Sequence, residues 1–383
     1  MFIGVYNELL RHELDVTRIK LGVVRVSTGE KTVNAIINSR FGYSAPSGTS
    51  KGRYEAKTLP PAKAIKNFNK IRKNFLGRFS QQEFDWLLKK NMDRVGAGVT
   101  TALSLAFFSS RPIIEQRFPN LAGKVFGGGM HAMASKINGT PAFQEFLSIP
   151  KKPKTIQQAA STNYRVWQTV GKKLKRMGKR ACPDYESGWT GNIDIEKILD
   201  MLSEFNNIHI GIDVAASCFY KNGKYNYNGK RLSRDAHIEY LVGLCKKYKI
   251  RYLEDPVHEQ DFSGFNKFRK KLKKTIIVGD DLTVTNPKRV REAIRRRAIT
   301  GLIIKPNQVG TLADSVYAMK LARKNKIKLV LSHRSGTTKS AVLARLALYA
   351  DYAKFGIAGI RQYKINELIR IWNKSKHPRM AQG

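Results

Sequence analysis

Acidic residues are scarce in this sequence. Its 383 residues include 29 Asp and Glu against 70 Lys and Arg, a formal net charge of +41. Cysteine is rarer still, and the scattered thiols Cys182, Cys218 and Cys245 lack metal-site spacing, so they predict neither a thiolate metal site nor a catalytic cysteine. No apolar run is long enough to cross a bilayer, and the N-terminus MFIGVYNELLRHELD lacks the pattern of a secretory signal. We therefore expect a cytoplasmic chain with no membrane span.

What is abundant is apolar content and positive charge. Hydrophobic residues make up 42% of the chain, an ordinary share for a globular protein, and the length favours two domains. A net charge of +41 attracts polyanions and predicts at least non-specific binding to nucleic acid. A proteome that is basic throughout would give the same charge without any special partner, and the sequence leaves both explanations open.

Five apolar, β-branched segments between residues 207 and 335 each end in a polar residue. They read NIHIGID, KIRYLED, KTIIVGDD, ITGLIIKPN and IKLVLSHRS, and end at Asp213, Glu254, Asp280, Lys305 and His333. After the first gap the spacing is roughly 25 to 30 residues, the period of a βα unit, and helical patterns fill the intervals. This alternation predicts a parallel sheet covered by helices. If the sheet closes into a barrel, all five residues lie at its C-terminal rim, where active sites of such barrels lie.

The residue types at these five strand ends favour one chemistry. Three converging carboxylates require a cation, and all-oxygen ligands suit Mg²⁺. A lysine beside a divalent cation is disfavoured as the ammonium form, so Lys305 could act as a general base. Together they predict proton abstraction next to a carboxylate, through a metal-stabilised enediolate. Any one of these residues alone could equally be a surface charge at the barrel rim.

The whole chain is expected to divide into three parts. Residues 1–15 are expected to be an N-terminal extension, 16–125 a smaller α+β domain, and 126–383 the barrel domain. Alternation after Val16 predicts two or three antiparallel strands, and the Gly- and Ser-rich loop PSGTSKGRYEA predicts a mobile segment. Helical patterns dominate from residue 61, and QEFLSIP predicts a further strand carrying Glu145.

At this point the sequence resembles the enolase family over nearly its whole length. The matching words are PSGTSKGRYEA, VGAGVTTALSLA, GGGMHA, FQEF, GIDVAASCFY, LEDP, VGDDLTVTNPKR, IKPNQVGT, SHRSG and RQYKINELIRI. The resemblance implies a (β/α)8 barrel preceded by an α+β capping domain, usually assembled as a homodimer. It also implies a lyase, phosphopyruvate hydratase, which dehydrates 2-phosphoglycerate to phosphoenolpyruvate in glycolysis and gluconeogenesis with two Mg²⁺ per active site.

The resemblance implies a role for each matching residue. Asp213, Glu254 and Asp280 would ligate one Mg²⁺ and Ser50 would help to hold the second, while Lys305 would remove the C2 proton. Glu186 with Glu145 would assist departure of the C3 hydroxyl, and His131 would close over the site on its loop. Arg334 and Ser335 would hold the phosphate with His333 alongside, and Gln144 would bind the substrate. Lys364 would pair with the carboxylate and help to keep Lys305 neutral.

The sequence departs from the family pattern in several loops. The acidic loop usually reads GDEGG and here reads DYESG, residues 184–188, while Lys51 replaces a usual threonine. After SHRSG the family carries ETED, and here Thr337 to Ser340 stand instead. These changes bear on rate and loop closure more than on the type of reaction.

Two alternatives belong to other classes of function. The basic runs at 66–78, 171–180, 267–274, 288–297 and 322–328 would suit an enolase-fold protein bound to RNA or a ribosome, with weak or no catalysis. Another reaction of the enolase superfamily is the second alternative. Arg334 and Ser335, joined to the Ser50 loop, favour 2-phosphoglycerate over other carboxylate substrates.

Overall fold

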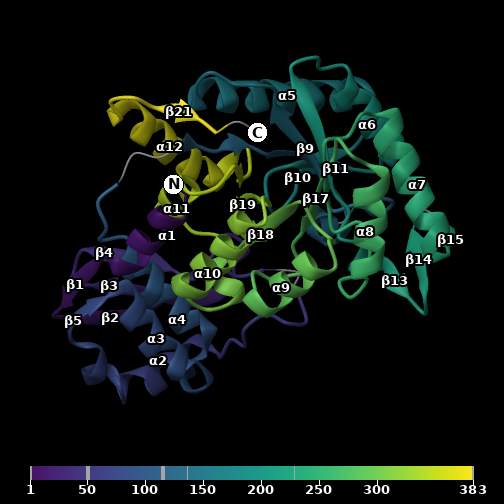
Figure 1. Ribbon diagram of the computed structural model, residues 1–383. Helices are drawn as coiled ribbons and strands as arrows, with labels where there is room; N and C mark the ends of the chain where they lie inside the picture. The colour runs from purple at the N-terminus through teal and green to yellow at the C-terminus, as the bar shows by residue number, and fades with distance from the viewer. Residues whose placement is uncertain (1, 49–51, 114–116, 136, 228, 382–383) are drawn as a thin grey trace.

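The computed structural model describes residues 2–48, 52–113, 117–135, 137–227 and 229–381, and side chains from residue 4 onward except 133–135 within these ranges (Figure 1). The chain has two structural parts. An α+β part formed by the first hundred or so residues, purple and blue in Figure 1, packs against one side of a large helix-covered barrel. The expected α/β architecture of a capping domain followed by a barrel is confirmed.

The N-terminal part is built on a three-stranded antiparallel sheet. Its strands are β2 (Ile19–Arg25), β3 (Lys31–Ile37) and β4 (Phe41–Ser44), as the alternation of apolar residues predicts. A separate two-stranded ladder pairs β1 (Glu13–Val16) with β5 (Gly77–Ser80). The helices of this part are α2 (Pro61–Asn69), α3 (Gln81–Lys90) and α4 (Met92–Phe108), with a short 3₁₀ turn at Arg72–Phe75.

Local capping explains where α3 begins. The Ser80 hydroxyl accepts the N–H of Glu83, and the Glu83 carboxylate accepts the N–H of Ser80, a complete capping box. The apolar helix α4, rich in small residues, is almost entirely buried, as its composition predicts. It lies against β3 and β4 and closes the core of this part.

Residues 2–11, set apart in the sequence as an extension, form helix α1 (Phe2–Arg11). Its Tyr6, Leu9 and Leu10 are buried. The Tyr6 hydroxyl donates to the carbonyl of Tyr349, and the Arg323 guanidinium donates to the Tyr6 hydroxyl. This helix therefore joins the N-terminal part to the outer helices of the barrel.

The barrel strands belong to one large sheet that closes on itself. Residues 120–127 form a nearly continuous stretch, assigned as β7 (Asn120–Leu121) and β8 (Gly123–Gly127), whose first half pairs with the last barrel strand and whose second half pairs with β9. The hydrogen bond from Ala122 N–H to the Ala353 carbonyl continues the ladder across the seam. The remaining barrel strands are β9 (Glu145–Pro150), β12 (Ile208–Asp213), β16 (Tyr252–Glu254), β17 (Ile276–Gly279), β18 (Gly301–Ile304), β19 (Lys328–Ser332) and β20 (Tyr352–Lys354).

Strand direction is mixed at the beginning of the barrel. Strands β12, β16, β17, β18, β19 and β20 are parallel, whereas β9 runs antiparallel to both β8 and β12. The N-terminal end of β9 therefore lies at the same rim as the C-terminal ends of the parallel strands. Inside the barrel, a layer of side chains fills the centre: Ala122, Leu147, Ile149, Tyr252, Val278, Ile303, Val330 and Tyr352.

The outer layer consists of helices connected to the strands by short loops. These helices are α5 (Ile156–Arg176), α6 (Ile195–Ser203), α7 (Arg234–Lys247), α8 (Phe262–Lys271), α9 (Pro287–Arg295), α10 (Leu312–Lys324), α11 (Val342–Ala347) and α12 (Gln362–Lys374). Further short strands are β6 (Arg117–Phe118), β10 (Ala181–Pro183), β11 (Trp189–Gly191), β13 (Tyr220–Lys221), β14 (Lys224–Tyr227), β15 (Lys230–Leu232) and β21 (Arg379–Met380). No helix in the described ranges has the length and apolarity needed to span a membrane.

Candidate active site at the barrel rim

The five predicted strand-end residues meet at one rim of the barrel. Asp213 and Glu254 are the last residues of β12 and β16, and Asp280, Lys305 and His333 each follow directly after β17, β18 and β19. Parallel strands end at the same edge of a barrel, so the geometry follows from the topology. Residues from elements far apart in the sequence thus surround one space.

Glu145 reaches the same rim from the opposite strand direction. It is the first residue of β9 and lies opposite Asp213 in the antiparallel ladder. Gln144 precedes it, and both are buried. The sequence predicted a strand here but left open which face of it Glu145 would occupy. The direction of the strand, which brings Glu145 to this rim, also could not be read from a single apolar run.

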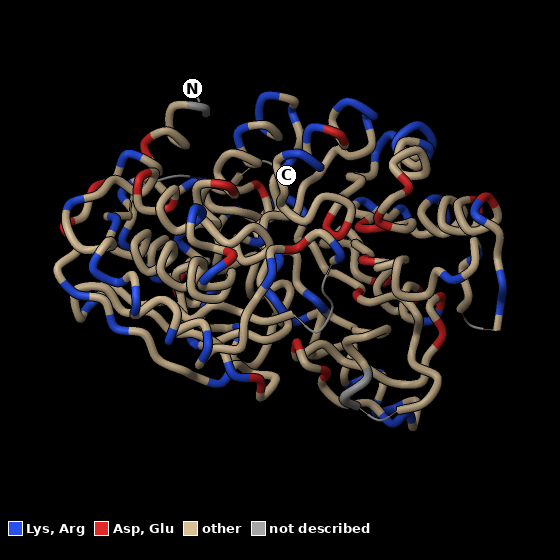
Figure 2. The backbone as a smooth tube through the Cα atoms, turned by 90° about the horizontal axis from the view of Figure 1, so that it is seen from below, with Lys and Arg blue, Asp and Glu red and all other residues tan. Residues whose placement is uncertain are grey.

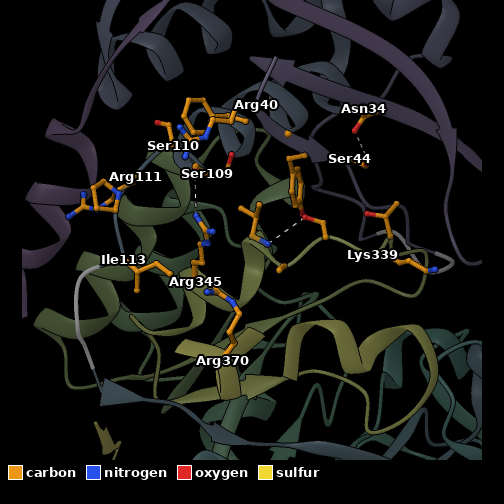
Figure 3. A pocket seen from close by; sticks show the side chains of 18 residues that line it. Asn34, Arg40, Ser44, Ser109, Ser110, Arg111, Ile113, Lys339, Arg345 and Arg370 are labelled. Atoms are coloured by element: carbon orange, nitrogen blue, oxygen red, sulfur yellow. Dashed lines mark hydrogen bonds between the residues drawn. The ribbon is translucent and has the colours of Figure 1, made fainter. Parts of the chain in front are cut away.

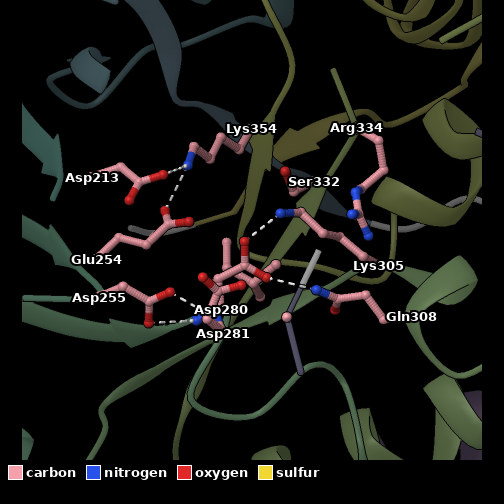
Figure 4. Close-up of polar contacts among 12 residues, drawn as sticks. Asp213, Glu254, Asp255, Asp280, Asp281, Lys305, Gln308, Ser332, Arg334 and Lys354 are labelled. Atoms are coloured by element: carbon pink, nitrogen blue, oxygen red, sulfur yellow. Dashed lines mark hydrogen bonds and ion pairs between the residues drawn. The ribbon is translucent and has the colours of Figure 1, made fainter. Parts of the chain in front are cut away.

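Lys354, which the sequence did not predict as a site residue, points toward Asp213 and Glu254 (Figure 4). It is the last residue of β20, and its Nζ atom is 2.7 Å from Glu145, 2.9 Å from Asp213 and 2.8 Å from Glu254. Burial opposes its charge, but these three carboxylates raise the pKa of Lys354 well above its usual range. It therefore carries a permanent positive charge inside the rim.

Lys305 faces Asp280 across neighbouring strand ends. The Lys305 ammonium donates to Oδ2 of Asp280, and the Gln308 amide donates to Oδ1 at 2.9 Å (Figure 4). Burial opposes protonation of Lys305, but the contact with Asp280 outweighs it and raises the pKa of the lysine. In this arrangement Lys305 is an ion-paired ammonium, and it can accept a proton only after Asp280 has another partner.

The acidic side of the rim holds more negative charge than the lysines neutralise. Burial and neighbouring carboxylates raise the pKa of Asp213, Glu254 and Asp255, and burial with Asp280 raises that of Asp281 to about 7. One oxygen of Glu254, Oε1, is buried without a hydrogen-bond partner among the described residues. Carboxylate oxygens of Asp255, Asp280 and Asp281 also lie within 4.8 Å of one another. Excess buried carboxylate and an unused oxygen fit a divalent cation with oxygen ligands.

A second buried cluster lies beside this acidic site. His131 Nδ1 is 3.4 Å from Glu145 and 3.8 Å from Glu186, and His333 Nε2 is 3.5 Å from Glu186. Lys124, which the sequence analysis did not select, lies among these groups with its Nζ 2.8 Å from His131 Nδ1. Burial opposes ionisation of Glu186, but the positive charges of His131, when it is protonated, and of Lys124 hold its pKa well below the usual range. Burial lowers the pKa of His333 to about 4, so this imidazole is neutral near pH 7.

The predicted phosphate-binding residues follow β19 directly. Arg334 is buried and ion-paired with Glu55 at 2.9 Å, while the backbone carbonyl of Ser335 accepts from Arg361. Gly48 is packed so tightly that a Cβ there would lie 1.9 Å from an Arg334 nitrogen. Gly48 is thus in close contact with the Arg334 guanidinium. Ser50, the predicted ligand of a second metal ion, lies outside the described residues.

Lys364 is separate from the carboxylates. It is buried in α12, and its ammonium donates to the Thr337 hydroxyl at 2.8 Å. Among the described residues no ion pair within 4.0 Å joins Lys364 to a carboxylate. Burial, followed by the nearby Arg361, lowers the pKa of Lys364 to about 7. The lysine in direct contact with Glu145, Asp213 and Glu254 is Lys354.

Comparison with known proteins decides the family. The family described as "Enolase, C-terminal TIM barrel domain" matches residues 116–378. The enolase of Archaeoglobus fulgidus is 34% identical over 369 residues, covering 88% of this chain and 91% of the relative. The enolases of Natronomonas pharaonis and Halobacterium salinarum are 33% and 34% identical, covering 93% and 90% of this chain and 98% and 96% of theirs.

The chain belongs to the enolase family. It is accordingly an enzyme of the lyase class, a phosphopyruvate hydratase, and relatives named enolase support dehydration of 2-phosphoglycerate as its general activity. The resemblance drawn from the sequence motifs is confirmed. Beside the rim, Lys124 contacts Asp184 of the loop that reads DYESG, residues 184–188.

Two further hollows lie away from the rim and are lined by cations. One, of about 930 Å³, lies between the N-terminal part and the barrel and includes Arg40, Arg111, Lys339, Arg345 and Arg370 (Figure 3). The other, of about 950 Å³, lies at the opposite mouth of the barrel, and its charged lining is Lys152, Arg251, Lys274 and Lys328. Neither hollow has an Asp or Glu among its described lining residues.

Proposed function

We propose that this enolase dehydrates 2-phosphoglycerate to phosphoenolpyruvate, with Lys305 as the base that removes the C2 proton. The observation that carries the proposal is the placement of Lys305 directly after β18, next to the carboxylates that end β12, β16 and β17. A base and a cation site on neighbouring strand ends suit removal of a proton next to a carboxylate.

Lys305 must lose its proton before it can act. In the substrate-free arrangement Asp280 holds it as an ammonium ion. When Asp280 serves as a metal ligand, its charge is taken up by the cation and no longer stabilises the lysine proton. Lys354, which keeps its contact with Glu145, and the nearby Arg334 both oppose the charge of Lys305, which favours the neutral amine.

Mg²⁺ is the cofactor expected for these carboxylates. Asp213, Glu254 and Asp280 would hold one ion, and Ser50 would contribute to a second when the loop closes on the substrate. Bound there, Mg²⁺ supplies positive charge that stabilises the extra negative charge on the substrate carboxylate after proton removal. The unpartnered Oε1 of Glu254 and the raised pKa values of Asp213 and Glu254 support this assignment.

The departing C3 hydroxyl would lie on the side of Glu186 and Glu145. Both carboxylates are buried within 4 Å of His131, which would close over the substrate. On the other side, Arg334 and Ser335 would hold the phosphate with the neutral His333 alongside, and Gln144 would contact the substrate. Lys354 takes the role of the cation at the substrate carboxylate that the resemblance implied for Lys364.

Turnover of 2-phosphoglycerate tests this proposal directly. We expect phosphoenolpyruvate to form with Mg²⁺, to disappear with a chelator, and to disappear in Lys305→Ala, since that variant removes the base and leaves the carboxylates in place. A wild-type protein that is folded and metal-bound but inactive would refute the proposal. Activity of Lys305→Ala near that of the wild type would refute the assignment of the base.

We further propose a cytoplasmic homodimer, the usual assembly of the family. Light scattering during size-exclusion chromatography tests the assembly. A mass near twice 43.3 kDa supports a dimer, and a mass near 43.3 kDa contradicts it.

Binding to RNA or a ribosome is a second candidate function. Figure 2 shows Lys and Arg along most of the chain, while many acids on the outer helices are already paired, such as Glu239 with Lys271 and Glu196 with Lys247. The hollow at the far mouth of the barrel adds a concentrated cationic site for phosphates. It lies opposite the catalytic rim, so both functions could coexist.

Matched charge reversals test this second candidate. Lys152→Glu with Lys274→Glu changes the hollow, and Lys63→Glu with Lys66→Glu changes the exposed face of α2 by the same charge. A docking site in the hollow predicts a larger loss of RNA affinity in the first pair, against random-sequence competitor. Equal losses in both pairs would indicate attraction by net charge alone.

A further inference from the structure

We propose that Lys124 is a positioning residue for the dehydration, which holds His131 and Glu186 in place on the side of the departing hydroxyl. The inference rests on the proposed function of the rim. Lys124 belongs to β8 and is 2% exposed. It is a buried charge that the mechanism above does not otherwise use.

The contacts of Lys124 reach every acidic and imidazole group of the second cluster except His333. Its Nζ lies 2.7 Å from Asp184 Oδ2, 2.8 Å from His131 Nδ1, 3.6 Å from Glu186 and 3.8 Å from Glu145. Three carboxylates buried this closely could not all be ionised without a cation between them. Lys124 therefore allows Glu186 and Glu145 to share this small space.

The contact with His131 determines which ring nitrogen carries the proton. An ammonium group has only donors, so Nδ1 of His131 must accept from Lys124. In the neutral imidazole the proton then lies on Nε2. The 3.4 Å approach of Nδ1 to Glu145 is longer, and we assign Nδ1 by the shorter contact. Lys124 thus sets both the orientation and the tautomer of His131.

Asp184 connects this lysine to the unusual DYESG loop. Its Oδ1 accepts the backbone N–H groups of Glu186 at 2.8 Å and Gly188 at 3.0 Å, and its Oδ2 faces Lys124. The loop that carries Glu186 is therefore tied through Asp184 to Lys124 on β8. A change at Lys124 would reach Glu186 by two routes, one through space and one through this loop.

Glycine residues provide the space for the pair. A Cβ at Gly127 would lie 1.8 Å from Asp184 Oδ2 and 2.8 Å from Lys124 Cε, and a Cβ at Gly188 would lie 3.0 Å from Lys124 Cγ. Gly128 and Gly129, which follow, serve another purpose, since Gly128 lies against the carbonyls of residues 141 and 143 and Gly129 has a φ of +50°. Of the three consecutive glycines, Gly127 is therefore the one that leaves room for the ion pair of Lys124 with Asp184.

A double variant separates a positioning role from mere neutralisation of Asp184. Lys124→Met alone leaves Asp184 and Glu186 without this lysine, while Glu145 keeps Lys354, and is expected to destabilise the protein. Lys124→Met with Asp184→Asn removes one charge of each sign, and the Asn oxygen can still accept the two loop N–H groups. We expect this double variant to regain thermal stability while kcat stays at least about tenfold below wild type with little change in KM.

The outcomes decide the inference in either direction. A double-variant kcat less than about tenfold below wild type would show that Lys124 serves only to neutralise Asp184, and would overturn the proposal. Asp184→Asn alone is the matched control and is expected to keep most of the activity, because it leaves Lys124 in contact with His131 and Glu186.

A second readout does not depend on turnover. ¹⁵N spectra of histidine-labelled protein report the tautomer of His131, assigned by comparison with His131→Asn. We expect the Nε2-protonated tautomer in the wild type and its loss in the double variant. The same tautomer in both would overturn the proposal, whereas an inactive wild type with the expected spectra would refute the proposed reaction and leave the placement of His131 by Lys124 supported.

Discussion

Lys354 and Asp213 face each other inside the barrel mouth, with the lysine Nζ 2.9 Å from Oδ2 of the aspartate. They end strands β20 and β12. In the closed sheet, the β7–β8 stretch and β9 lie between these two strands. Closure of the sheet is therefore what brings this cation to the acidic residues. The contact distinguishes Lys354 from Lys364, which lies on α12 and donates to the Thr337 hydroxyl.

The two lysines are expected to respond differently to the same substitution. Lys354→Met should lower kcat by at least about 100-fold, because it removes a fixed cation from the reacting region. Lys364→Met should leave kcat within about tenfold of wild type, since the hydrogen bond that is lost is to Thr337 and not to a carboxylate. Steady-state kinetics of both purified variants measure this, with circular dichroism to show that each is folded. A larger loss of kcat in Lys364→Met than in Lys354→Met would assign the catalytic cation to Lys364 on α12.

The sequence predicted the rim because its signal is local. Asp213, Glu254, Asp280, Lys305 and His333 each end an apolar run, and parallel topology then brings them together. Lys354 ends a strand of only three residues, in the words DYAKFG, which carry too few apolar residues to stand out. Lys364 was named from the resemblance, because it stands in the matching word RQYKINELIRI.

Lys124 was missed for a different physical reason. It lies in a short strand interrupted by glycines, so its burial could not be read from periodicity. Its partner Asp184 is sixty residues further along the chain and meets it only through the pairing of β8 with β11. A departure of the DYESG loop from the family pattern was visible in the sequence, and a compensating change elsewhere could have been sought from it.

Arg334 is expected to act through exchange of partners. Its ion pair with Glu55 links it to the glycine- and serine-rich loop, and a phosphate would compete for the same guanidinium. Arg334→Lys keeps the charge but loses the two-pronged contact, so KM for 2-phosphoglycerate should rise about 10- to 100-fold. Substrate titrations at saturating Mg²⁺ measure this. An unchanged KM would place the phosphate elsewhere.

Mg²⁺ is expected to stabilise the fold through the acidic rim. A ligand that binds only the folded state adds about 2.7 kcal/mol at 100 times its Kd, which should raise the Tm by a few degrees. Glu254→Gln should lose most of this rise, because the amide is a neutral and weaker ligand. Thermal scans with Mg²⁺ and with chelator test both proteins. An equal rise in Glu254→Gln would move the ion to another group, such as Asp255 with Asp281.

Asp85 is expected to make stability depend on pH. This carboxylate of α3 is 1% exposed and accepts from the Gln81 side chain and from the N–H of Ala313, in the first turn of α10. Burial raises its pKa to about 7. Between pH 4 and 7 the unfolded chain has released this proton while the folded chain retains it, so the free energy of unfolding falls as the pH rises through this window.

Asp85→Asn removes this titration and serves to measure it. At pH 5 the variant should be less stable by about 1 to 3 kcal/mol, since Gln81 and Ala313 donate to different oxygens of Asp85 and the amide NH2 replaces one of these oxygens. The difference from wild type should shrink by pH 8, where the buried wild-type carboxylate is ionised at a cost in stability. Urea titrations from pH 5 to 8 measure the difference, with Asp93→Asn on the exposed start of α4 as the matched control. If the difference in free energy of unfolding between the two proteins stays constant over this range, Asp85 is ionised throughout. The first turn of α10 would then stabilise the ionised carboxylate.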